Sequence, residues 1–305
     1  MDAAPALTPD RVLRRLEWRV IRRLDGRLQG DYRTLIRGQG TDFRDLREYE
    51  PGDDVRYIDW NVSARMDTPY VRQYLEDREV TAHFLLDLSP SVDFGTINTL
   101  KRDQLVDFVA LLARLLTRHG NKVGAILYAG KVERTIPADG GKMQVLRLLN
   151  DIVKFPRLQS APYTSVSDLV EHALRTIRRR SVVFLVSDFF SAPGWERPLG
   201  MLARKHEVIA VRLEDPRERE LPDIGMVVMN DAETGESVHV DTHDAKFRKR
   251  FDAVVRKREA DLHGAFARSG VDVLTLSTEE DLVRAVLRFA ALRKQRRGMP
   301  AAVAV

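Results

Sequence analysis

Asp87, Ser89 and Ser91 form an Asp-x-Ser-x-Ser sequence at the end of an apolar run that begins at residue 81. One carboxylate and two hydroxyls from a single short loop are hard oxygen donors, the kind that Mg²⁺ and Mn²⁺ prefer. Mg²⁺ takes near-octahedral geometry, so three protein oxygens leave positions for water or for a carboxylate from another molecule. The residue types and spacing therefore favour a small divalent cation at this loop.

Two further loops strengthen this interpretation. Asp188 closes a second apolar run at residues 182–186, and the hydroxyl-rich segment 163–168 precedes a helical pattern. The carboxyl ends of parallel strands lie at one edge of a sheet, where ligands bind. A purely structural alternative is that Ser89 and Ser91 cap the next helix while the two aspartates accept hydrogen bonds from loop amides.

Strands and helices alternate after residue 80, which predicts a doubly wound α/β fold with a mostly parallel sheet and helices on both faces. Two patterns depart from this alternation: an antiparallel pair around the turn 129–131 at the sheet edge, and a hairpin inserted near 225–241. Gly270 is expected to end a long helix, and Ser277 to Glu280 to open the last one as a capping box. The other expected elements are helical stripes at 105–116, 143–153, 166–177 and 247–267, and strands at 81–88, 181–186, 207–213 and 271–276.

The first 79 residues differ in pattern, and we expect three parts: residues 1–79, 80–295 and a flexible tail at 296–305. The first part begins with an amphipathic helix at 10–28, followed by a charged, β-rich lobe. Nine arginines and three acidic residues lie between positions 11 and 37, whereas seven acidic residues and three arginines lie between 42 and 59. Adjacent blocks of opposite sign can pair within the fold or form a docking face.

Composition excludes several classes of protein. The 305 residues include 44% apolar and 31% charged residues, which is typical of a globular protein, and the net charge is +5. Without cysteine the chain has no disulfide, thiol nucleophile or thiolate-bound metal. No apolar run approaches the ~20 residues of a membrane span, and residues 1–5 lack the features of a signal peptide, so we expect a cytoplasmic protein.

The segment before the first core strand carries a long signature. Residues 40–61 read GTDFRDLREYEPGDDVRYIDWN, and the pattern continues with Ala64-Arg65, Tyr70-Val71-Arg72 and residues 76–79, EDRE. With the loops at Asp87 and Asp188, this signature resembles a bacterial family known as domain of unknown function 58. That family is similar to von Willebrand factor A domains that carry a metal-ion-dependent adhesion site. The resemblance covers nearly the whole chain and implies a von Willebrand factor A-like fold.

By this resemblance Asp87, Ser89, Ser91 and Asp188 belong to a site for Mg²⁺ or Mn²⁺. The family commonly has a threonine before an Asp-Leu or Asn-Leu pair, and here Ser167 stands before Asp168-Leu169. Ser167 is therefore the expected third hydroxyl ligand, with Thr164 as the alternative.

The resemblance further implies a non-enzymatic adaptor that links a MoxR-type AAA+ ATPase to a client protein for maturation or complex assembly. Arg56, Asp59 and Trp60 in the charged signature are expected to form a second partner-binding surface. We expect no nucleic-acid partner, because the apolar stripe of the arginine-rich helix indicates that it packs on one side.

Two alternatives remain open. In a metal-dependent hydrolase Asp87 and Asp188 would hold a metal that activates water, although no general base is evident. A nucleic-acid-binding protein would use the arginine block at 11–37 and the basic stretch 246–250, and its binding would weaken steeply with salt.

Overall fold

A six-stranded sheet forms the centre of the computed structural model, which describes residues 8–9, 43–51, 53–74, 79–96, 99–158, 164–230 and 237–298. The strands lie in the order β10-β7-β6-β3-β4-β5, and every neighbouring pair is parallel except β4 with β5. Their bounds are β3 (Thr81–Asp87), β4 (Lys122–Tyr128), β5 (Val132–Asp139), β6 (Val182–Ser187), β7 (Glu207–Glu214) and β10 (Asp272–Ser277). The predicted mostly parallel sheet and its antiparallel edge pair are confirmed.

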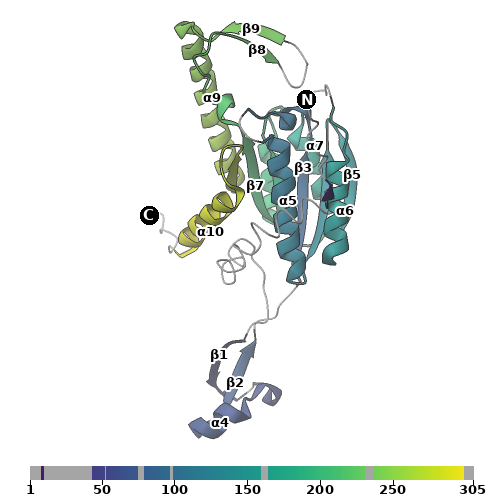
Figure 1. Cartoon of the computed structure of the whole chain (residues 1–305). Helices are drawn as coiled ribbons and strands as arrows, with labels where there is room; N and C mark the ends of the chain where they lie inside the picture. The colour runs from purple at the N-terminus through teal and green to yellow at the C-terminus, as the bar shows by residue number, and fades with distance from the viewer. Residues whose placement is uncertain are drawn as a thin grey trace. The chain divides into compact units, whose positions relative to one another are not determined.

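Helices cover both faces of this sheet (Figure 1). One face packs against α7 (Val166–Thr176), α8 (Glu196–Lys205) and the carboxyl-terminal end of α9 (Ala245–Ser269). The other packs against α5 (Lys101–Arg118), α6 (Gly141–Val153) and α10 (Leu282–Gly298). The doubly wound α/β fold is therefore confirmed.

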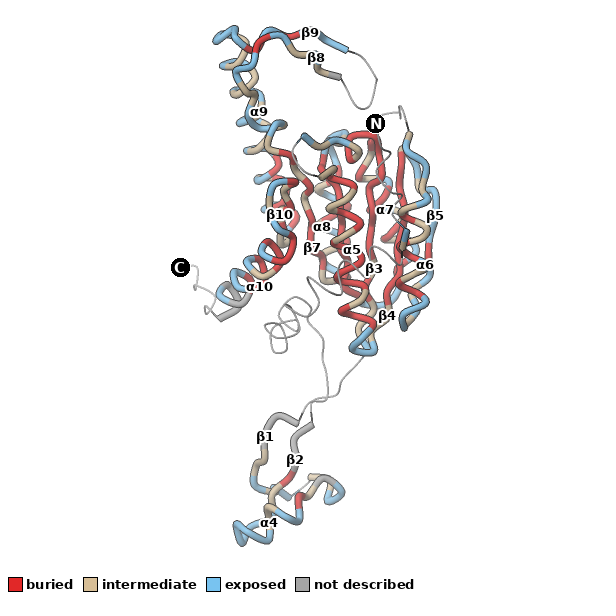
Figure 2. Tube along the Cα trace, in the orientation of Figure 1, coloured by how far each residue is buried: buried red, intermediate tan, exposed pale blue. Residues whose placement is uncertain are grey.

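The core follows the alternation of side chains along the central strands. Phe84 and Phe184 stack with ring centroids 5.4 Å apart, and Phe108 of α5 packs edge-on against Phe184. Leu85 and Leu185 point to the opposite face, toward α7 and α8. Because β3 and β6 are covered on both faces, they are apolar along nearly their whole length, as buried parallel strands are. Figure 2 shows the buried residues concentrated in these strands.

Beyond the sheet, α9 carries the predicted hairpin, in which β8 (Met226–Asn230) pairs antiparallel with β9 (Ser237–Asp241). All the buried residues of α9 lie in its last two turns, from Leu262 to Ser269, while its first half extends past the sheet toward the hairpin (Figure 1). Gly270 ends α9 with a φ of 67°, in the left-handed region that glycine adopts without strain, as the sequence predicts.

The predicted capping box at Ser277–Glu280 is wrong. Helix α10 begins later, at Leu282, and the side chain of Asp281 accepts a hydrogen bond from the Arg284 amide. Thr278 is instead buried, and its hydroxyl donates to Asp215 Oδ2 at 2.7 Å. One residue of the predicted motif is thus used in a tertiary hydrogen bond, and an amide at the start of the helix is accepted by Asp281 and not by Ser277.

Residues 36–80 form a separate compact unit. In it β1 (Phe43–Glu48) pairs antiparallel with β2 (Tyr70–Tyr74), and between them lie the short helices η2 (Val55–Tyr57) and α4 (Trp60–Met66). The predicted helix at 10–28, the whole arginine block at 11–37 and residues 299–305 of the expected tail lie outside the described residues. No helix in the described ranges combines the length and the apolar character needed to cross a membrane.

Candidate functional site

The order of the sheet reverses at β3 and β6, which are neighbours although 94 residues intervene between them. The loops that follow these two strands leave the same edge of the sheet in divergent directions. In open α/β sheets this switch point is where ligands bind. Asp87 and Asp188 both lie there, one at the end of β3 and the other directly after β6.

Asp87 is fully buried and held at both carboxylate oxygens. Its Oδ1 accepts a hydrogen bond from the Ser89 amide at 3.1 Å, and its Oδ2 accepts one from the Ser187 hydroxyl at 2.6 Å. Burial, with a further contribution from the Asp188 carboxylate, raises the pKa of Asp87 to about 6. The site therefore disfavours the charged form of this carboxyl group unless a cation is near.

The hydroxyl oxygens of Ser89 and Ser91 lie 3.1 Å apart, and both residues are buried. Ser89 precedes the short helix η3 (Pro90–Asp93), but its side chain makes no capping hydrogen bond there. The structural alternative expected Ser89 to cap this helix, and Ser89 does not. It also expected Asp87 and Asp188 to accept hydrogen bonds from loop amides, and both do. The two hydroxyls face each other beside Asp87 as a pair of neutral oxygen donors.

Asp188 sits in a tight turn. Its Oδ1 accepts the Phe190 amide at 3.0 Å, and Phe189 between them has a φ of 57°, which is uncommon for a residue other than glycine. The other oxygen of Asp188 accepts a hydrogen bond from Lys101 Nζ at 2.6 Å, and Lys101 also donates to Glu218 Oε1 at 2.5 Å. Asp188 therefore already has a cation as a partner.

Lys101 is the first residue of α5, and its side chain is only 1% exposed. Burial disfavours its charged form, but the carboxylates of Asp188 and Glu218 outweigh burial and raise the pKa of Lys101. For Glu218 the balance is reversed, since burial and the nearby Asp188 carboxylate together raise its pKa more than Lys101 lowers it. Lys101 is thus an ammonium ion enclosed in the protein.

The third loop contributes Thr164, which is 1% exposed. Its carbonyl oxygen accepts the Ala192 amide and the Ser191 hydroxyl, both at 3.0 Å, so this segment is tied to the loop that follows Asp188. The neighbouring Ser165 amide donates to the hydroxyl of the buried Tyr128 at 2.9 Å. Thr164 is therefore fixed against the second loop of the site.

Ser167 has a different position. It lies within α7, is partly exposed, and its hydroxyl is 3.5 Å from Glu171 Oε1 on the same helix. The structure brings Asp87, Ser89, Ser91 and Asp188 to one edge of the sheet with Thr164 against the Asp188 loop, and places Ser167 on the helix beyond. This geometry favours Thr164 as the third hydroxyl ligand.

The residues at this edge fit a hard divalent cation. Within the described ranges no cluster of three or more histidine, cysteine or acidic side chains has the geometry of a metal centre, so a site must use hydroxyls. Ser89, Ser91 and Thr164 would hold Mg²⁺ or Mn²⁺ beside Asp87, whose negative charge is favoured by a nearby cation. Such a metal would supply a positive centre that attracts a carboxylate.

Three residues of this cluster were not foreseen from the sequence: Lys101, Ser187 and Glu218. Lys101 had a usable signal, because it stands four residues before Leu105 and seven before Phe108 on the buried stripe of α5. A lysine on an apolar stripe needs a buried partner. The partners themselves are 87 and 117 residues away in sequence, and no local pattern identifies them.

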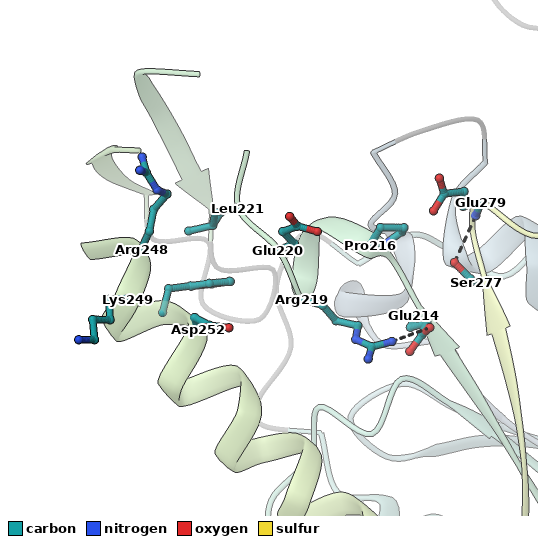
Figure 3. Close-up of a pocket in the computed structure, with 11 residues that line it drawn as sticks. Glu214, Pro216, Arg219, Glu220, Leu221, Arg248, Lys249, Asp252, Ser277 and Glu279 are labelled. Carbon is teal, nitrogen blue, oxygen red and sulfur yellow. Dashed lines mark hydrogen bonds and ion pairs between the residues drawn. The ribbon is translucent and has the colours of Figure 1, made fainter. Parts of the chain in front are cut away.

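A polar pocket opens at the same edge of the sheet, beyond the ends of β7 and β10 (Figure 3). Both signs of charge line it, and Arg219 pairs with Glu214 across 3.4 Å. The short helix η4 (Pro216–Glu218) stands beside it, with Glu218 directed to Lys101. The pocket is lined by Glu214, Pro216, Arg219, Glu220, Leu221, Arg248, Lys249, Phe251, Asp252, Ser277 and Glu279.

The expected partner-binding residues lie in the unit 36–80 and differ in what they do. Trp60 is 69% exposed, and Arg56 is exposed and paired with Asp54 at 2.6 Å. Asp59 is buried and caps α4, accepting the amides of Asn61 and Val62 at 3.1 and 3.3 Å. Trp60 and Arg56 are accessible, while Asp59 has a structural role in presenting them.

Several solved structures are similar to this chain over most of its length, at low sequence identity. BatB from Bacteroides thetaiotaomicron is 13% identical with a TM-score of 0.46, covering 71% of this chain and 99% of that one. The VWA domain of SpRpn10 is 10% identical with a TM-score of 0.40, covering 69% of this chain and 95% of that one.

Sequence relatives are closer. The uncharacterized proteins Rv1480 of Mycobacterium tuberculosis and Mb1516 of Mycobacterium bovis are each 37% identical over 283 residues, which is 93% of this chain and 89% of theirs. A family model described as "Protein of unknown function DUF58" matches residues 45–261, which include all but the first five residues of the charged signature and every loop of the site. This chain belongs to the DUF58 family.

Proposed function

We propose that the protein is a non-enzymatic adaptor that binds a partner's acidic side chain through a metal held by the β3 loop. The observation that carries the proposal is the buried hydroxyl pair of Ser89 and Ser91, 3.1 Å apart beside the Asp87 carboxylate. A cation bound mainly by neutral hydroxyls keeps most of its positive charge. A carboxylate from a partner is then a favourable further ligand.

The proposed partners are a MoxR-type AAA+ ATPase and a client protein that it matures or assembles in the cytoplasm. This part rests on the family resemblance of the charged signature. Trp60 and Arg56 supply the exposed contacts of a second surface, because tryptophan and arginine are enriched among the residues that dominate binding at protein interfaces.

A catalytic role for Asp87 and Asp188 is less favourable. Asp87 is buried with hydrogen bonds at both oxygens, and Asp188 is paired with Lys101, so neither is placed to activate water freely. Metal-dependent turnover of a phosphoester by the pure protein, lost in Asp87→Ala, would establish the hydrolase instead.

The proposal is tested by affinity capture of the tagged full chain from extracts of its own cells. Four samples are compared: wild type with Mg²⁺, wild type with EDTA, Ser89→Ala with Mg²⁺ and Ser277→Ala with Mg²⁺. Ser277 is a matched control, since it is another serine at the carboxyl end of a strand of the same sheet but lies on β10. We expect an AAA+ ATPase with wild type and Ser277→Ala in Mg²⁺ and its loss in the other two. The same proteins in all four samples would refute the metal-dependent site.

A further inference from the structure

Lys101 occupies the position of a counter-ion inside the candidate site. Its ammonium lies between Asp188 Oδ2 at 2.6 Å and Glu218 Oε1 at 2.5 Å, and the exposed fractions of the three side chains are 1%, 0% and 14%. The rings of Phe94 and Phe190 lie 5.7 and 5.3 Å from the same nitrogen. Carboxylates and aromatic faces thus surround the charge, and both kinds of neighbour stabilise a cation.

The position of Lys101 is fixed from several directions. Its backbone amide donates to the Phe94 carbonyl at 2.9 Å, which joins the start of α5 to the loop that carries Ser89 and Ser91. Glu218 is held in turn, because its Oε2 accepts the Asp215 amide at 3.1 Å. Asp215 is itself buried and accepts hydrogen bonds from Thr96 Oγ1 at 2.6 Å and Thr278 Oγ1 at 2.7 Å. The ammonium is therefore part of a preformed network and not a side chain that has folded inward by chance.

This arrangement changes what Asp188 can do. One of its oxygens accepts an amide and the other accepts the ammonium, so its charge is already compensated before any metal arrives. Of the two strand-end aspartates, Asp87 is the one whose hydrogen bonds come from neutral donors, so it is the one left to balance a divalent cation among Ser89, Ser91 and Thr164. Such a cation would also be repelled by Lys101.

We propose that Lys101 is a built-in competitor of the metal, one that neutralises Asp188 and thereby keeps the affinity of the hydroxyl site for a divalent cation low. The inference rests on the proposed function for the location of the metal and adds the control of its occupancy. The bound metal remains strongly electrophilic, so that occupancy rises when a partner supplies the missing carboxylate. Metal and acidic partner then bind together, and neither binds tightly alone.

The test is Mn²⁺ binding to the full chain, measured by electron paramagnetic resonance of the free ion. Lys101→Met removes the charge at nearly the same length, and Lys101→Arg is the control that keeps it. We expect Lys101→Met to bind Mn²⁺ at least tenfold more tightly than wild type and Lys101→Arg to stay within threefold of it. Equal or weaker binding by Lys101→Met would overturn the inference.

A second site created by the substitution is distinguished by the double variant Ser89→Ala/Lys101→Met. If the double variant lacks the increase in Mn²⁺ affinity that Lys101→Met causes, the metal binds at the hydroxyls and the inference is supported. If the double variant keeps the increase in Mn²⁺ affinity, the metal binds between Asp188 and Glu218 and the inference is refuted.

Should Lys101→Met fail to fold, Glu218→Gln gives an independent measurement. It leaves Lys101 with Asp188 as its one carboxylate partner in this cluster and makes the cluster more positive, so we expect Mn²⁺ affinity to fall threefold or more. Unchanged or higher affinity would contradict the inference.

The outcomes for wild type separate this inference from the proposed function. If wild type binds Mn²⁺ through Ser89 and Lys101→Met binds it equally, the inference fails and the metal-dependent adaptor survives. If only Lys101→Met binds Mn²⁺ through Ser89, even when an acidic peptide is added to wild type, Lys101 is the resident cation and the metal-dependent function fails.

Discussion

The hydroxyl of Ser187 lies 2.6 Å from Asp87 Oδ2, a hydrogen bond that joins the ends of β3 and β6 across 100 residues of sequence. The same hydroxyl accepts the Phe189 amide at 2.9 Å. One side chain therefore aligns the two loops that carry the aspartates. Both residues are fully buried, so water cannot replace this bond.

Replacing Ser187 with alanine is expected to lower the free energy of unfolding by about 1–3 kcal/mol, because a buried carboxylate loses its strongest donor. Urea denaturation at pH 7 measures this loss. In the Asp87→Asn background the same substitution is expected to cost less, since the acceptor is no longer a carboxylate. Equal costs in both backgrounds would show that the two side chains are not coupled.

If the third hydroxyl ligand is Thr164 in the loop and not Ser167 on the helix, substitutions at these two residues are expected to affect Mn²⁺ binding differently. Thr164→Ser keeps the hydroxyl and is expected to preserve Mn²⁺ binding, whereas Thr164→Val is expected to weaken it about tenfold. Ser167→Ala is expected to change it by less than twofold, because that hydroxyl points to Glu171. Calorimetric titration with Mn²⁺ compares the three variants, and a large effect of Ser167→Ala alone would restore the helix position as the ligand.

His83 on β3 makes stability depend on pH. Burial, and to a smaller extent His206, lowers the pKa of His83 to about 4, below the 6.5 expected in the unfolded chain. The folded state thus disfavours protonation of His83. The contribution of the neutral imidazole to the free energy of unfolding is therefore complete above pH 6.5 and is lost as the pH falls toward 4. The free energy of unfolding of wild type minus that of His83→Gln is therefore expected to decrease between pH 7 and pH 4.5.

The difference between the two proteins is the quantity to measure, because Asp87 acts in the opposite sense. Its raised pKa of about 6 relieves an unfavourable charge as the pH falls through the same range, and it does so in both proteins. Denaturant unfolding at half-unit pH intervals provides the comparison. A constant difference would mean that His83 titrates equally in the folded and unfolded chain.

Trp60 and Asp59 are adjacent, and we expect their substitutions to act on different properties. Trp60→Ala removes a 69% exposed side chain and is expected to change stability by less than about 0.5 kcal/mol while reducing capture of the ATPase. Asp59→Ala removes the cap of α4 and is expected to cost the unit about 1 kcal/mol. Capture assays beside thermal unfolding of both variants distinguish contact from support, and full capture by Trp60→Ala would exclude this surface.

The architecture was predictable because local and long-range signals agree. Residues 182–186 are apolar without interruption, which is typical of a parallel strand covered on both faces, so β6 is predicted from the sequence as a buried strand. Asp188 at its end is then brought to the edge where Asp87 lies. The family signature and the strand ends point to the same four residues, Asp87, Ser89, Ser91 and Asp188.

The failures are tertiary in origin. Thr278 lies inside the predicted capping box, but it is buried with its hydroxyl donated to the Asp215 carboxylate, and the helix starts beyond the motif at Leu282. The position of Lys101 on the apolar stripe of α5 signals that it needs a buried partner, but the two carboxylates that meet this need come from distant loops. Neither set of tertiary contacts can be identified from the local sequence.

Helix α9 connects the exposed hairpin to the turn that holds Asp188. At the buried end of the helix Phe266 packs against Phe189, with ring centroids 4.8 Å apart, and this contact supports the left-handed backbone of that residue. One turn above the buried segment, Arg258 lies 3.3 Å from the centre of the Phe190 ring and donates to the Asp188 carbonyl at 3.2 Å. The part of α9 that extends toward β8–β9 is thus longer than the buried part that packs on the core. A displacement of the hairpin would therefore be transmitted along α9 to Phe189 and Phe190, the two residues that complete the Asp188 turn.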